Sequence, residues 1–194
     1  MSRTRFAALT IAACLMLGGS AATADRPQGD LSIGLGIAAL TGGAVQDWYG
    51  SNGYSVSLGY RVSRGWKDEQ IISLSYLKSS GKSFGAGAAR FDSWLTDWTI
   101  GITFRKRPTD ANKLYFGYGG GLCLLGEKSS TNGFTTSRDT NPALEAHAVG
   151  GVALSDAVHL ELGYTQFLSS VHNPAGGGSS AAGGAFTFSM AGRF

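Results

Sequence analysis

The chain has 194 residues, of which 30 are glycine and only 15% are charged, and its formal net charge is +3. Soluble domains average about 25% charged residues and about 7% glycine, so this composition is unlike that of an ordinary soluble enzyme. Aliphatic and aromatic residues are too frequent for a disordered chain, and the glycines follow no three-residue period, which excludes collagen. One ordered domain is expected.

The amino terminus has the pattern of a secretory signal peptide. Arg3 and Arg5 precede an apolar run over residues 6–17, and small residues follow up to Ala24. We expect residues 1–24 to be removed and residues 25–194 to form the mature domain. Loss of the two arginines lowers the net charge to +1, which argues against nucleic acid as a partner.

The two cysteines allow one alternative reading of this terminus. Residues 11–14 end in Cys14 and resemble a lipoprotein signal, although the apolar run continues past the cysteine. Removal of residues 1–24 would leave Cys123 as the single cysteine. No internal disulfide is then expected in the exported chain.

The mature sequence offers no run of about 20 apolar residues that could form a membrane helix. Apolar residues instead recur with a period of two, which predicts β-strands. This period appears in eight segments: residues 31–39, 54–63, 72–76, 94–105, 114–124, 144–154, 158–165 and 186–194.

The connections between these segments alternate in length. The long ones cover residues 41–52, 79–90, 126–141 and 169–183, and the short ones cover residues 64–70, 106–113 and 155–157. In an up-and-down antiparallel arrangement this alternation places long loops at one rim and tight turns at the other, as in transmembrane barrels. The long connections are rich in Gly, Ser, Thr and Asn, so we expect mobile loops suited to surface contact.

The second face of each predicted strand distinguishes a membrane barrel from a soluble periplasmic β-protein. A water-facing surface would be rich in Lys, Glu and Asp, whereas here this face carries mostly Gly, Ser, Thr and Ala. Small residues suit the narrow lumen of an eight-stranded barrel. The sequence therefore predicts an all-β, eight-stranded antiparallel up-and-down transmembrane β-barrel, with aromatic girdle candidates on the lipid side: Tyr60, Tyr76, Trp94, Trp98, Tyr118 and Tyr164.

Two segments extend this reading to a family. The turn LSDAVHLELGY and the carboxy-terminal AFTFSMAGRF resemble the small eight-stranded outer-membrane barrels of the OmpA/OmpX type, which include surface antigens of Gram-negative bacteria. The resemblance implies an outer-membrane location, contact with membrane lipid and lipopolysaccharide, and a monomer. It also implies that the assembly machinery reads the terminal strand through Phe186, Phe188, Met190 and Phe194.

Charged and histidine side chains on the inner face are the candidate functional residues. We expect a polar network in the lumen, with a salt bridge between Arg193 and Glu161 because an unpaired charge in a narrow interior is costly. We interpret it as a plug that fills space, the alternative being a gate or proton path. The network comprises Arg61, Asp97, Arg105, Glu145, His147, His159, Glu161 and Arg193.

These residues do not form a recognisable catalytic or metal site. Pairing across the turn at residues 155–157 separates His147 from His159 by about 20 Å, which is too far for a shared metal. The His-x-Ser pair of lipid A deacylase barrels is absent at His172. We therefore expect no enzyme activity and no cofactor, and a structural or adhesin-like surface role. A passive pore is the first alternative and a lipid A-modifying enzyme the second.

Overall fold

A computed structural model describes residues 31–64, 68–84, 90–106, 113–131, 134–173 and 179–194. The predicted signal peptide, with Cys14, lies outside the described residues, so its removal stays a prediction. The described part of the chain contains the other cysteine, Cys123, which is free and buried.

The described chain consists almost entirely of strands, with one short helix. The elements are β1 (Leu31–Thr41), α2 (Gly43–Tyr49), β2 (Asn52–Arg64), β3 (Asp68–Phe84), β4 (Arg90–Lys106), β5 (Leu114–Thr131), β6 (Phe134–Ala153), β7 (Val158–Phe167), β8 (Val171–His172), β9 (Ser180–Ala181) and β10 (Gly184–Arg193). No helix in these ranges is long and apolar enough to cross a membrane.

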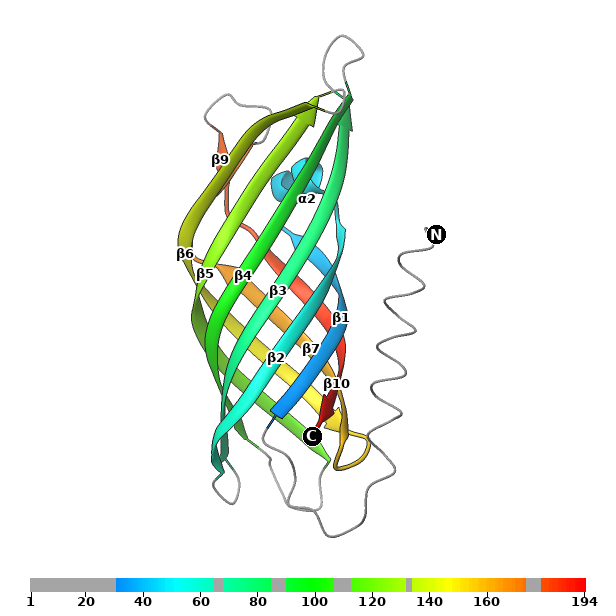
Figure 1. Ribbon diagram of the computed structural model, residues 1–194, viewed down its shortest axis with the longest axis vertical. Coiled ribbons are helices and arrows are strands. Elements are labelled where there is room, and N and C mark those ends of the chain that lie inside the picture. Colours follow the sequence, from blue (N-terminus) through cyan, green and yellow to red (C-terminus); the bar gives the residue numbers. More distant parts are fainter. Residues whose placement is uncertain (1–30, 65–67, 85–89, 107–112, 132–133, 174–178) are drawn as a thin grey trace.

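Eight of the described strands form a closed antiparallel barrel (Figure 1). The order around the barrel is β1, β10, β7, β6, β5, β4, β3 and β2, so each strand pairs with its neighbours in sequence and β10 closes onto β1. The closing pair runs from Ser32 opposite Arg193 to Thr41 opposite Gly184. Closure removes free sheet edges along this length and confirms the predicted fold.

The strands differ in length in a way that the sequence did not predict. Strands β3 to β6 have 17 to 20 residues, whereas β1, β2, β7 and β10 have 10 to 13. Residues 126–131 and 134–141 belong to β5 and β6, so the prediction of a mobile loop there is wrong. The Ser- and Thr-rich composition of residues 126–141 reflects strands that continue beyond the apolar part of the outer wall. Figure 1 shows β3 to β6 rising above the other strands of the barrel.

The first connection carries α2, which packs into the end of the barrel where the long strands rise (Figure 1). Val45 and Tyr49 of this helix are fully buried, and they pack in one cluster with inward-facing strand residues such as Leu40 and Leu95. The last long connection carries the β8–β9 hairpin at the same end. This end of the barrel is therefore filled by the chain itself.

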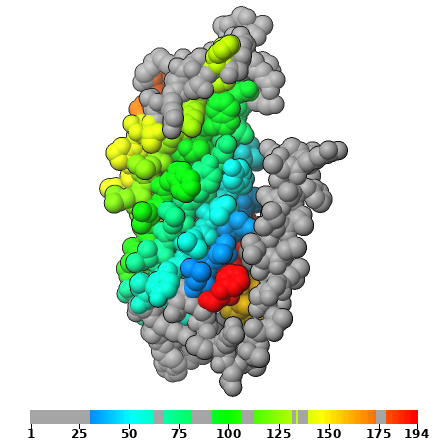
Figure 2. All heavy atoms as spheres, in the orientation of Figure 1, coloured from blue at the N-terminus to red at the C-terminus, as the bar shows by residue number. Residues whose placement is uncertain are grey.

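The outer wall is apolar, as the period of two predicted. Leu122 is 70% exposed, and Tyr118 and Ile100 are each 65% exposed. Figure 2 shows one side of this wall, where side chains of β1 to β4 cover the barrel. Among the girdle candidates, Tyr60, Trp98 and Tyr118 are the most exposed. An apolar surface of this extent is stable against lipid and not against water.

Candidate functional site: the lumen and the protruding sheet

The structure places the eight candidate lumen residues on the inner wall. Five of them are buried: Arg61, Asp97, Glu145, His159 and Arg193. The other three are half-buried: Arg105, His147 and Glu161. They divide into two groups at different heights. One group lies toward the short-turn end, and the other lies about midway along β4 to β6.

The short-turn end holds a network of guanidinium and carboxylate groups. The predicted salt bridge between Arg193 and Glu161 is wrong, because Arg193 Nη2 donates to Glu69 Oε2 at 3.1 Å. Glu161 lies opposite Ser189, four residues from Arg193 along β10, which is about 13 Å of strand. Its partner is Arg105, whose Nη2 lies 2.6 Å from Glu161 Oε1.

Sequence reasoning missed Glu69 in this network. This residue was assigned to the turn at residues 64–70, whereas β3 begins at Asp68 and places Glu69 on the inner wall. The signal that could have found it is the period of two, which continues backward from Ile71 to Glu69. Glu69 also lies opposite Arg105 in the register of β3 and β4.

Glycines on the inner wall make room for the large side chains of this network. A Cβ on Gly151 would overlap the ring of Tyr115, whose hydroxyl donates to Glu161 Oε1 at 2.6 Å. The Tyr115 ring also stacks edge-on against His159, with 5.7 Å between the centroids. Gly119 similarly faces the His147 ring. The lumen glycines therefore serve as spaces that side chains from other strands fill.

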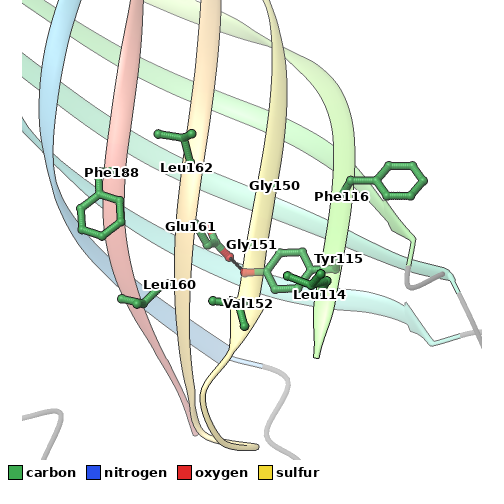
Figure 3. Close-up of a pocket in the computed structure, with 10 residues that line it drawn as sticks. All are labelled: Leu114, Tyr115, Phe116, Gly150, Gly151, Val152, Leu160, Glu161, Leu162 and Phe188. Atoms are coloured by element: carbon green, nitrogen blue, oxygen red, sulfur yellow. Dashed lines mark hydrogen bonds between the residues drawn. The ribbon is translucent and has the colours of Figure 1, made fainter. Parts of the chain in front are cut away.

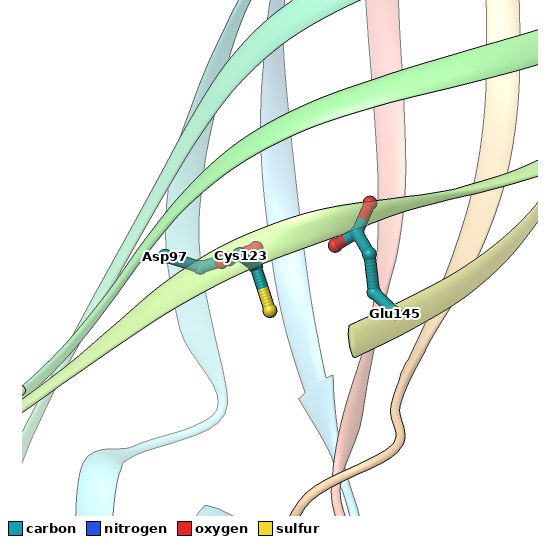
Figure 4. Close-up of side chains that lie close together, drawn as sticks. All are labelled: Asp97, Cys123 and Glu145. Atoms are coloured by element: carbon teal, nitrogen blue, oxygen red, sulfur yellow. The ribbon is translucent and has the colours of Figure 1, made fainter. Parts of the chain in front are cut away.

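The second group combines the carboxylates of Asp97 and Glu145 with His147, and the Cys123 thiol lies beside the two carboxylates (Figure 4). Ligand atoms of Asp97, Cys123 and Glu145 all lie within 4.8 Å of one another, so these three residues form a possible metal-binding set. The Thr99 hydroxyl lies 3.2 Å from Asp97 Oδ1 and 3.0 Å from Glu145 Oε2, and it bridges the carboxylates. A hydroxyl carries one proton, so Thr99 donates to one of the two carboxylates at a time.

The two histidines of interest lie apart, in agreement with the predicted register. His147 lies opposite Thr165, and His159 lies opposite Ala153. His147 Nε2 contacts Thr103 Oγ1 at 2.8 Å, and its Nδ1 lies 3.3 Å from Glu145. His147 therefore belongs to the carboxylate group and His159 to the short-turn end.

Above the carboxylate group an apolar cluster occupies the lumen, although the polar side chains of Ser79, Ser93 and Glu127 are also buried at this end. Here α2 inserts Val45 and Tyr49 among buried side chains of the strands and of β8: Leu40, Leu77, Leu95, Leu125, Phe167, Val171 and Ala185. The Tyr49 hydroxyl donates to the His172 carbonyl at 2.8 Å, which ties the helix to the β8–β9 hairpin. We call this cluster the apolar plug.

The outer wall carries a row of aromatic side chains just below the apolar plug. Tyr76 and Trp98 lie opposite each other, with ring centroids 4.5 Å apart, and Tyr54 lies 6.1 Å from Tyr76. In β5, which pairs with β4, outward apolar residues run from Leu114 to Leu124. That length agrees with the 9 to 11 residues of a tilted transmembrane strand. The aromatic row therefore marks one border of the apolar belt.

A shallow groove of about 620 Å³ lies on this outer wall over β5, β6, β7 and β10 (Figure 3). Gly150 leaves space between the exposed side chains of Phe116, Leu162 and Phe188. Its lining is almost wholly apolar, and it continues the apolar belt. The groove is therefore part of the apolar outer wall.

Beyond the belt, β3 to β6 continue as a four-stranded sheet. β7 pairs with β6 only over residues 145–153, while β6 pairs with β5 from Phe134 onward. β2 pairs with β3 only as far as Ser79. Residues 134–143 and 80–84 therefore form the two edges of this protruding sheet.

Comparison with known proteins identifies the fold. No family model and no curated protein matches the sequence. Among solved structures, Ail, the attachment invasion locus protein of Yersinia pestis, matches with a TM-score of 0.55 and 17% identity. Neisserial surface protein A matches with the same two values, and each comparison covers 87% of this chain and 100% of the other. OprG, an outer membrane protein of Pseudomonas aeruginosa, matches over 87% of this chain and 97% of its own, with a TM-score of 0.53 and 9% identity. The chain has the fold of the small eight-stranded outer-membrane barrels.

Proposed function

We propose that this chain is an integral protein of a Gram-negative outer membrane, closed to solutes, that makes contacts outside the cell through its protruding sheet. The apolar belt supports the location, because a wall with Leu122 and Ile100 exposed needs lipid around it. The belt also supports contact with membrane lipid and lipopolysaccharide. The long-strand rim would then face outward and the short turns would face the periplasm.

The filled lumen is the observation that carries the closed state. Arg105 and Tyr115 converge on Glu161 at the short-turn end, and the apolar plug occupies the opposite end. A passive pore needs a continuous aqueous path, and these two layers of packed side chains argue against one. The same feature supports a non-enzymatic role, since the candidate lumen residues are buried or half-buried.

The protruding sheet supports surface contact. Its edge at residues 134–143 offers backbone N–H and C=O groups that an extended segment of another protein could pair with. The structural neighbours include a protein named for attachment, and one crystal structure of it holds the heparin analogue sucrose octasulfate. We therefore place an adhesin-like role before a purely structural one.

Conductance and fractionation test the closed barrel. The folded protein should fractionate with the outer membrane and migrate faster on a gel before boiling than after it. In planar bilayers it should give no steady single-channel openings. Regular openings of uniform size would overturn the proposed closed state and establish the pore alternative. Incubation with lipid A should leave the lipid mass unchanged, and a mass change would establish the enzyme alternative.

A shortened hairpin tests the surface role. Lys128 lies opposite Arg138, so replacing residues 129–137 by Asn-Gly joins β5 to β6 by a tight turn at a paired position. Bacteria that express this variant should adhere to cultured epithelial cells about tenfold less than bacteria that express the natural chain. The control replaces exposed Lys106 at the opposite rim by Gln and should adhere normally. Equal adherence of the shortened variant, folded by the gel criterion, would contradict the surface role.

The remaining expectations on partners follow from the same proposal. The closing strand β10 carries Phe186, Phe188 and Met190, and Phe194 directly follows it. All four side chains are exposed, which is compatible with an assembly signal. Replacing Phe194 by Ser should slow assembly into the membrane without changing the stability of the assembled barrel. A protein mass in detergent equal to the mass of one chain would agree with a monomer.

A further inference from the structure

The short-turn end of the lumen carries more positive than negative charge. Three guanidinium groups, those of Arg61, Arg105 and Arg193, face two carboxylates, those of Glu69 and Glu161. All five side chains are at most 15% exposed. Because a guanidinium does not release its proton in proteins, these five described side chains together carry one more positive than negative charge.

The carboxylates are already engaged. Glu161 Oε1 accepts from both Arg105 Nη2 and the Tyr115 hydroxyl, each at 2.6 Å. Glu69 Oε2 accepts from Arg193, while Glu69 Oε1 lies 3.9 Å from Arg61 Nε, which is too long for a hydrogen bond. Arg61 therefore lies beside a carboxylate that another arginine already holds.

Several guanidinium N–H groups consequently lack an acceptor. Within the described part of the chain, Arg61 Nε, Arg61 Nη1 and Arg193 Nη1 are buried without a hydrogen-bond partner. Arg61 is 5% exposed and Arg193 is 8% exposed. Ile71 lies opposite Arg61 and offers no side-chain acceptor, whereas Ser32 lies opposite Arg193 and its hydroxyl donates to the Gly59 carbonyl at 3.3 Å.

We propose that Arg61 and Arg193 bind a small monovalent anion of the halide class, with chloride as the natural ligand. Both guanidiniums lie beside Glu69, one near each oxygen of its carboxylate, so a single site beside Glu69 adjoins both. A single negative charge balances the surplus of this layer. A halide suits an interior that is only wide enough for side chains, whereas a larger oxyanion would displace them.

Anion-dependent stability of the folded protein tests this site. The mature barrel is unfolded reversibly by urea in lipid vesicles, at constant sodium concentration, with chloride progressively replacing gluconate. At a chloride concentration about ten times the dissociation constant, the unfolding equilibrium constant should fall about elevenfold relative to gluconate. Bromide should act similarly, since it has the same charge and a similar radius.

Two variants separate the site from a general salt effect. Arg61→Gln removes the surplus charge and leaves the Arg193–Glu69 pair, so it should lose the chloride response. The control Lys106→Gln removes an exposed charge near the same rim and should keep the response. Equal stability of the natural chain in chloride and gluconate would overturn the proposal, and so would a chloride response that persists in Arg61→Gln.

A direct measurement remains decisive if Arg61→Gln does not fold. Crystals of the natural chain grown in bromide should give an anomalous peak between the guanidiniums of Arg61 and Arg193. A water molecule there, without anomalous signal, would show that solvent satisfies the free N–H groups and would overturn the proposal. A peak confined to the protein surface would do the same.

Discussion

Replacing Glu69 by Gln tests the observed charge pairing of the lumen. Glu69 Oε2 accepts from Arg193 at 3.1 Å, and Arg61 lies beside Oε1 at 3.9 Å. Removing one partner of a buried pair costs about 3–5 kcal/mol of the free energy of unfolding. A glutamine oxygen can still accept one hydrogen bond from Arg193, so we expect the lower limit, about 3 kcal/mol. The unfolding equilibrium constant should rise by about a hundredfold.

Urea unfolding in vesicles, followed by tryptophan fluorescence, measures this change. The control is Asp68→Asn, which neutralises the exposed neighbouring carboxylate and should change the free energy of unfolding by less than about 0.5 kcal/mol. In double-mutant cycles, Arg193→Gln should couple to Glu69→Gln and should be additive with Glu161→Gln. Equal effects of the Glu69 and Asp68 variants, or coupling of Arg193 to Glu161 alone, would refute the pairing.

Three further substitutions test the packing of the lumen. Gly151→Ala adds a Cβ that overlaps the Tyr115 ring, and it should cost about 1–3 kcal/mol of the free energy of unfolding. A Cβ on Gly150 has nothing within 4 Å, so Gly150→Ala should cost less than about 1 kcal/mol. Equal losses in the two variants would contradict the predicted overlap. Leu95→Ala, in the apolar plug at 0% exposure, should cost about 2–5 kcal/mol in the same urea assay, and an unchanged midpoint would mean that the plug is not packed. Tyr49→Phe removes one hydrogen bond between α2 and β8 and should cost about 1 kcal/mol; hydrogen exchange at α2 should quicken with it, and unchanged exchange would argue that this bond does not hold the helix.

The sequence predicted the barrel because its signal is local and repetitive. The alternation of Tyr54, Val56, Leu58 and Tyr60 with small residues reports the two faces of a strand directly, and all four are exposed on the outer wall. The correct register of His147 and His159 followed from one short turn. Charge pairing around the barrel needs more, because it depends on strand stagger and side-chain reach across several strands.

Glu69 illustrates that limit. Its neighbours Asp68 and Gln70 are polar, so the segment resembles a turn even though Glu69 alternates in phase with Ile71. Strand order and stagger bring it to Arg193, which is far away in sequence and lies on β10. Neighbouring strands alone suggest Glu161 as the partner of Arg193, because β7 is next to β10. Glu161 lies opposite Ser189, however, which is four residues from Arg193 along β10.

The protruding sheet was missed for a different physical reason. In β3 the outward apolar series ends at Tyr76, after which Leu77 points inward and is 7% exposed. In β5 the same change occurs between outward Leu124 and inward Leu125, which is 1% exposed. The apolar residues thus move from the lipid side to the lumen side at one height, and Trp98 lies at that height, opposite both Tyr76 and Leu124. Below it the outer wall is apolar and the lumen holds the polar network, whereas above it the apolar plug occupies the lumen. A break in the alternation that recurs at the same register in adjacent strands therefore indicates where the apolar belt ends, not where the strands end.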